Sequence, residues 1–93
     1  MEGENYRLQV WYTGHVQGVG FRYKTTNIAA GFDVQGYVEN LDDGRVHLVA
    51  VGKRDEVREF ADEVAKIMAS FIRNIDERED FTAQSYKGFL IRL

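Results

Sequence analysis

The 93-residue sequence contains no cysteine. The chain therefore has no disulfide framework, no thiolate nucleophile and no metal site built on sulfur. This absence fits a reducing compartment, and we expect a cytoplasmic protein. Histidine is also scarce, because His15 and His47 stand far apart and lack the spacing of metal ligands. We expect no bound metal and no other cofactor.

Long apolar runs and an excess of basic residues are missing as well. No apolar stretch approaches the ~20 residues that span a bilayer, and the N-terminal MEGENYR lacks the basic and apolar regions of a signal peptide. The formal net charge of −3 argues against electrostatic binding of nucleic acid. We therefore expect a monomer without membrane or nucleic-acid partners.

The residues that are present are typical of one globular domain. Hydrophobic residues make up 44% of the chain and charged residues 29%. The sequence contains no internal repeat, low-complexity segment or linker, and its length suffices for one domain but not for two. We expect a single domain over residues 1–93.

Hydrophobic periodicity predicts the elements of the first third of the chain. Residues 6–13 alternate between apolar and polar side chains, which predicts a strand. From Phe21, apolar spacings of three, four and seven residues predict a helix that ends at Phe32. Either Gly31 or Asp33 is expected to terminate this helix in the left-handed conformation.

The remaining chain predicts a hairpin, a second helix and two further strands. The runs VQGYVEN and RVHLVAV are joined by LDDG, and Asp-Gly turns favour the positive φ angles of hairpins. An apolar stripe from Val57 to Phe71, which includes Ile67, predicts a long helix with one buried face. The segment IRNIDEREDF predicts a half-exposed edge strand, and GFLIRL a short terminal strand.

This order of elements, β-α-β-β-α-β with a terminal strand, predicts a ferredoxin-like two-layer α+β sandwich. An antiparallel sheet then carries both helices on one face. Right-handed crossovers place the first strand in the centre of that sheet. The segment GHVQGVGFR should therefore leave a central strand and enter the first helix.

The glycines of GHVQGVGFR match neither the P-loop nor the dinucleotide-binding pattern. A flexible connection is the simplest interpretation. Two features favour an anion site instead: Val16 and Val19 can fix the loop to the core, and Arg22 enters the first helical turn. Backbone N–H groups at a helix N-terminus, beside a guanidinium, suit a phosphate or carboxylate.

These residues closely resemble the acylphosphatase family. The family pattern G-x-V-Q-G-V-x-F-R is met from Gly14 to Arg22, and the asparagine of G-[W/Y]-V-x-N is met at Asn40, eighteen residues later. The resemblance continues through GRV at residues 44–46 and GFLIR near the end, and so covers nearly the whole chain. It implies a ferredoxin-like fold and the hydrolysis of acyl phosphates to a carboxylate and inorganic phosphate.

The resemblance also implies roles for individual residues. Arg22 would bind the phosphoryl oxygens, and Asn40, on a strand beside the loop, would orient the attacking water. Backbone N–H groups of a phosphate-binding loop would surround the phosphoryl group. The residues of this loop are His15, Val16, Gln17, Gly18, Val19, Gly20 and Phe21.

Other interpretations remain open at this level. Departures from the family pattern at Asp33, Tyr37 and Lys53 leave substrate preference and stability open. Asn40 could instead serve the hairpin turn.

A non-catalytic phosphate- or RNA-binding module shares the element order, although the aromatic motif of RNA-binding modules is matched only weakly, at the loop, in GVGFRY. A domain acting on carbamoyl phosphate, as in a hydrogenase-maturation protein, would be followed by further regions, and we expect a stand-alone enzyme.

Overall fold

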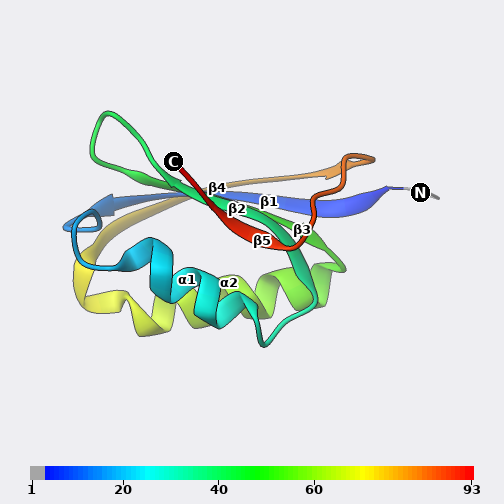
Figure 1. The fold of residues 1–93 in the computed structure, drawn as a ribbon, viewed down its shortest axis with the longest axis horizontal. Helices are drawn as coiled ribbons and strands as arrows, with labels where there is room; N and C mark the ends of the chain where they lie inside the picture. Colours follow the sequence, from blue (N-terminus) through cyan, green and yellow to red (C-terminus); the bar gives the residue numbers. More distant parts are fainter. Residues whose placement is uncertain (1–3) are drawn as a thin grey trace.

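A computed structural model describes residues 4–93. The elements are β1 (Asn5–Gly14), α1 (Phe21–Ala29), β2 (Val34–Asn40), β3 (Val46–Gly52), α2 (Arg54–Ile67), a 3-10 turn η1 (Ala69–Phe71), β4 (Ile72–Thr82) and β5 (Phe89–Arg92). Both helices cover the same face of a five-stranded sheet (Figure 1). The predicted two-layer α+β sandwich is confirmed.

The strands lie in the order β4-β1-β3-β2-β5, so β1 is central as predicted. The first four strands pair in antiparallel fashion: β1 with β3 and β4, and β2 with β3. β5 lies parallel to β2 at the sheet edge, which makes the sheet mixed rather than wholly antiparallel. The apolar pattern of GFLIRL predicts a strand, but it does not indicate which strand is the partner or whether the pairing is parallel.

The hydrophobic core lies between the sheet and the two helices. On β1 the alternation holds, because Leu8, Val10 and Tyr12 are at most 1% exposed on the helix-facing side. The largest fully buried side chains are Tyr12, Phe21, Phe60, Leu8, Leu48 and Met68. The buried alternate residues of the strands and the apolar face of α2 therefore form one core.

The first helix ends earlier than its apolar periodicity predicts. α1 stops at Ala29 rather than Phe32, because the N–H groups of Gly31 and Phe32 donate to carbonyls only three residues back. Neither Gly31 nor Asp33 adopts a positive φ, so the prediction of a left-handed terminator is wrong. Phe32 lies in the turn after α1 and still packs against the core. Its apolar side chain therefore fits the helical spacing although it lies outside the helix.

The second helix also ends early. α2 stops at Ile67, whose side chain is 45% exposed, so the prediction that Ile67 belongs to the buried stripe is wrong. Phe71 packs against the core from η1 instead. The chain must turn here to enter β4, and a tightened final turn brings Phe71 inward where a continued helix would not.

Thr25 on α1 predicts a measurable effect on stability. Its hydroxyl is buried and has no hydrogen-bond partner within residues 4–93. A buried hydroxyl without a partner costs about 1–3 kcal/mol, and valine keeps the shape of threonine without the polar atom. We expect Thr25→Val to raise the free energy of unfolding by about 1 kcal/mol and Tm by about 4–8 °C.

Thermal unfolding followed by circular dichroism measures this shift. Thr26→Val is the matched control, because the Thr26 hydroxyl donates to the Tyr23 carbonyl at 2.7 Å and should gain nothing from the change. A lower Tm for Thr25→Val than for the unmodified protein would contradict the expectation.

Candidate active site

The loop between β1 and α1 (residues 15–20) and the β2–β3 turn lie at the same end of the sheet (Figure 1). A pocket of about 250 Å³ opens between them and the end of β5. Its lining consists of Val16, Gly18, Gly20, Phe21, Arg22, Tyr23, Asn40, Ile91 and Leu93. Residues from three separate parts of the chain, 16–23, 40 and 91–93, therefore meet in one small pocket.

Two glycines give the loop its path into the helix. Gly18 and Gly20 both have φ of 78°, a left-handed conformation that glycine adopts without strain. A Cβ atom at either position would meet nothing within 4 Å, so glycine is required here for its backbone conformation rather than for space. Gly20 is also the N-cap of α1 and offers no capping side chain, so the first N–H groups of α1 can bind an anion.

The loop is fixed to its surroundings. Val16 is fully buried in the core, and Val19 packs against the core. The Gln17 side chain donates from Nε2 to the carbonyls of Leu41 and Arg45, at 2.8 and 2.9 Å. These carbonyls belong to the β2–β3 turn, so Gln17 ties the loop to that turn. The alternative of a flexible connection does not fit these contacts.

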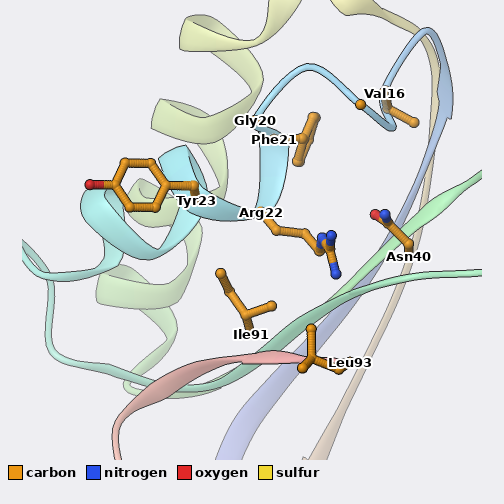
Figure 2. A pocket seen from close by; sticks show the side chains of 9 residues that line it. Val16, Gly20, Phe21, Arg22, Tyr23, Asn40, Ile91 and Leu93 are labelled. Carbon is orange, nitrogen blue, oxygen red and sulfur yellow. The ribbon is translucent and has the colours of Figure 1, made fainter.

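Arg22 and Asn40 approach each other across the pocket. Arg22 lies in the first turn of α1, and its side chain extends toward Asn40 at the end of β2 (Figure 2). Within residues 4–93, no carboxylate forms a salt bridge with Arg22. Its positive charge is therefore available to an anionic ligand in the pocket.

Asn40 reaches the loop by a route that the sequence did not indicate. We expected Asn40 to lie on a strand next to β1. This expectation is wrong, because β3 separates β2 from β1. Instead, the Gln17 side chain of the loop bonds to the β2–β3 turn, which follows Asn40 directly. Asn40 and Val38 share the helix-facing side of β2, which directs Asn40 into the pocket.

The β2–β3 turn is closed by groups other than the Asn40 side chain. The Leu41 N–H donates to the Arg45 carbonyl at 2.8 Å, and the Arg45 N–H donates to Asp43 Oδ1 at 3.1 Å. Gly44 has the positive φ predicted for this hairpin. The interpretation of Asn40 as a turn residue is therefore the weaker one.

The structure divides the predicted loop residues into two groups. Val16, Gly18, Gly20 and Phe21 line the pocket together with Arg22 and Asn40. The side chains of the other three lie elsewhere: His15 is exposed, Gln17 bonds the turn, and Val19 packs on the core.

The contribution of β5 to the pocket was not predicted from the sequence. Ile91 and Leu93 line it, because the parallel pairing of β5 with β2 brings the chain end beside Asn40. Tyr23 is also part of the lining, although its ring points away from Arg22 (Figure 2). The alternation of Phe89, Ile91 and Leu93 was the available signal, but it does not identify the neighbouring strand.

The aromatic side chains on the opposite face of the sheet contact other side chains. Trp11 stacks on His47 with ring centroids 4.8 Å apart and an angle of 19°. The guanidinium of Arg92 lies 3.6 Å from the centre of the Tyr37 ring. These contacts fit packing residues better than open platforms for stacking nucleic-acid bases.

Residues 4–93 contain no group of three or more histidine, aspartate or glutamate side chains arranged to hold a metal ion. No helix in the same part is long and apolar enough to cross a membrane.

Comparison with known proteins assigns the family. The acylphosphatase family model matches residues 8–91. An acylphosphatase of Thermotoga petrophila is 42% identical over 86 residues, which cover 91% of this chain and 94% of that protein.

Solved structures agree with this match. The acylphosphatase of Bacillus subtilis has a TM-score of 0.84 at 28% identity and covers 95% of this chain and 99% of its own. An acylphosphatase from Coxiella burnetii has a TM-score of 0.80 at 28% identity, covering 98% and 96%. The match extends over the strand, the loop, Arg22 and Asn40 described above. The chain belongs to the acylphosphatase family of hydrolases.

Proposed function

We propose that this protein hydrolyses the carboxyl–phosphate bond of small acyl phosphates in the pocket formed by residues 15–21, Arg22 and Asn40. The observation that carries the proposal is the convergence of Arg22 and Asn40, from α1 and β2, on a pocket lined by the glycine loop. Membership of the acylphosphatase family supports the same reaction.

The phosphoryl group binds to donors from the loop and from Arg22. The N–H groups of residues 15–21 and the first turn of α1 offer hydrogen bonds and the positive end of the helix dipole. The Arg22 guanidinium adds a full positive charge and a planar pair of donors that matches two phosphoryl oxygens. Fixed donors of this kind stabilise the negative charge that is spread over the transferring group.

Asn40 orients the water that attacks phosphorus. An amide side chain can donate to and accept from a water molecule but cannot take its proton at neutral pH. The water oxygen forms a bond to phosphorus while the bond from phosphorus to the acyl oxygen breaks. The electron pair leaves with the carboxylate, and the water proton passes to a phosphoryl oxygen.

The reaction needs no general acid at the leaving group. The conjugate acid of the departing carboxylate has a pKa of about 4, so the carboxylate leaves without protonation. An alkyl alcohol is a far poorer leaving group and would require a proton donor. The proposed site therefore acts on acyl phosphates in preference to ordinary phosphate esters.

Phosphate release from acetyl phosphate in the presence of a metal chelator tests the proposal. We expect turnover that is unchanged by the chelator, because Arg22 and the loop N–H groups supply the positive field. Inorganic phosphate should inhibit competitively, since product and substrate share these donors. If release did not exceed that of a protein-free control, catalysis would be excluded and a phosphate-binding role would take its place.

Gln17 provides a test of the loop itself. Gln17→Met keeps the length of the side chain but removes both hydrogen bonds to the β2–β3 turn. Two lost bonds of about 1 kcal/mol each should lower the free energy of unfolding by about 2 kcal/mol. The loop donors lose their fixed position, and we expect kcat/KM for acetyl phosphate to fall about 10-fold.

Gln84→Met is the matched control, because Gln84 lies exposed in the β4–β5 connection, away from the pocket. It should leave both stability and kcat/KM unchanged. Equal kcat/KM for Gln17→Met and the unmodified protein would show that the loop keeps its position without the bonds to the turn.

A further inference from the structure

A buried histidine lies between the two strands that carry the parts of the site. His47 belongs to β3, is only 8% exposed and faces the side of the sheet away from the helices. β3 lies between β1, which leads into the glycine loop, and β2, which ends at Asn40. A side chain of β3 is therefore placed to join the strand of the loop to the strand of Asn40.

The His47 ring is hydrogen-bonded to both neighbouring strands. Its Nδ1–H donates to Glu39 Oε2 of β2 at 2.7 Å, since a carboxylate can only accept. Its Nε2 is hydrogen-bonded to the side-chain amide oxygen of Gln9, on β1, at 2.9 Å. Hydrogen bonds through both ring nitrogens fix the orientation of an imidazole. His47 therefore bridges β1 and β2 across the strand that separates them.

Two aromatic rings hold the same imidazole. Trp11 of β1 stacks on it, with ring centroids 4.8 Å apart and an angle of 19° between the planes. Tyr37 of β2 meets it edge-on, with centroids 6.0 Å apart and an angle of 79°. Each neighbouring strand thus supplies one polar and one aromatic side chain. A nearly buried polar network in which each member is bonded is rigid.

This bridge lies near the end of the sheet that carries the pocket. Glu39 directly precedes Asn40 and is the register partner of His47 on β2. The register partner on β1 is Trp11, three residues before Gly14, with which the strand ends. The side chains of the bridge point to the opposite face of the sheet and do not line the pocket. They can therefore affect the site only through the strands that carry it.

We propose that His47 is a positioning residue for the reaction: by joining β1 to β2, it sets the position of Asn40 relative to the glycine loop. The inference rests on the proposed function, in which Arg22 and the loop bind the phosphoryl group and Asn40 orients the water. The water must attack in line with the bond that breaks, and a displacement of about 1 Å can lower a rate about 100-fold.

The two parts of the site respond differently to the loss of the bridge. The donors to the phosphoryl group come from the loop and from α1, which follow β1 as one continuous segment. A shift of β2 relative to β1 leaves these donors in place and moves Asn40. Loss of the His47 bridge should therefore reduce the rate of water attack and not the binding of phosphate. Gln17 differs, because it bonds the loop itself.

Kinetics of His47→Leu with acetyl phosphate test the inference. Leucine has a similar bulk but forms neither hydrogen bond. We expect kcat to fall about 10-fold, while KM and the affinity for inorganic phosphate, measured by calorimetry, stay within about 2-fold. His47→Gln is a milder variant, because glutamine can still donate to Glu39 but loses the stacking ring and the bond to Gln9. Its kcat should lie between the other two, and it carries the test if the leucine variant does not fold.

Val49→Ala is the matched control for a general loss of stability. Val49 is the next residue of β3 on the same face, is 3% exposed and does not line the pocket. Its truncation should lower Tm, measured by circular dichroism, but leave kcat unchanged at a temperature well below unfolding. A fall in kcat as large as that of His47→Leu would overturn the inference, because any weakening of β3 would then suffice.

A double variant shows whether His47 acts through Asn40. If it does, His47→Leu should change kcat by less than about 2-fold when residue 40 is already alanine. The same 10-fold loss in both backgrounds would overturn the inference, and so would an unchanged kcat of His47→Leu. Full activity of Asn40→Ala would instead overturn the proposed role of Asn40, and absence of phosphate release from the unmodified protein would overturn the proposed function.

Discussion

Arg22→Ala should reduce kcat/KM for acyl phosphates by about 10³-fold or more. Arg22 is the pocket residue that carries a full positive charge, and within residues 4–93 no carboxylate pairs with it. Alanine would remove the two charge-assisted hydrogen bonds that Arg22 is proposed to donate to the phosphoryl group, at the stage where the negative charge of that group is most spread out. Phosphate release under saturating and limiting substrate measures the loss in kcat and in kcat/KM.

Arg22→Lys separates charge from geometry. Lysine restores the positive charge but not the planar pair of donors, so we expect it to recover about 10-fold of the lost activity and no more. Arg45→Ala is the control, because Arg45 carries the same charge near the pocket but pairs with Asp43 at 2.8 Å. A drop for Arg45→Ala as large as that for Arg22→Ala would mean that general positive charge matters rather than contact.

Asn40→Ala should lower kcat by about 10²–10³-fold with little change in KM. Asn40 is proposed to hold the attacking water, whereas Arg22 and the loop hold the phosphoryl group. Its removal therefore leaves substrate binding intact and takes away only the orientation of the nucleophile. Binding of inorganic phosphate, measured by calorimetry, should remain close to that of the unmodified protein.

Two variants make the Asn40 test specific. Asn40→Asp keeps the shape but places a negative charge beside the phosphoryl group, so it should lower phosphate affinity as well as kcat. Asn74→Ala, on the exposed β4 strand, should leave activity unchanged, since within residues 4–93 the Asn74 side chain bonds only to Asp76. Full activity of Asn40→Ala would rule out the proposed role of Asn40 in orienting water.

Features that depend on neighbouring residues followed from the sequence. The strand before the loop, the hairpin turn at Gly44 and the entry of Arg22 into the first helix were all predicted correctly. Each is governed by side-chain periodicity or by φ preferences within a few residues. The prediction that Val16 and Val19 fix the loop to the core is also confirmed.

Features that depend on packing between distant segments could not be predicted from the sequence. The helices end at Ala29 and Ile67, earlier than predicted, because the chain turns there toward the next strand. Apolar periodicity continues across such a turn and does not reveal it.

By itself, then, the sequence determined a glycine loop that ends in Arg22 and an asparagine at the end of a later strand. Only the tertiary structure decided what surrounds them: the Gln17 bonds to the β2–β3 turn, and the position of Ile91 and Leu93 in the lining of the same pocket. The physical reason is that strand order and parallel pairing are set by the whole core, because the free energy that selects β5 as the neighbour of β2 comes from contacts distant in the chain.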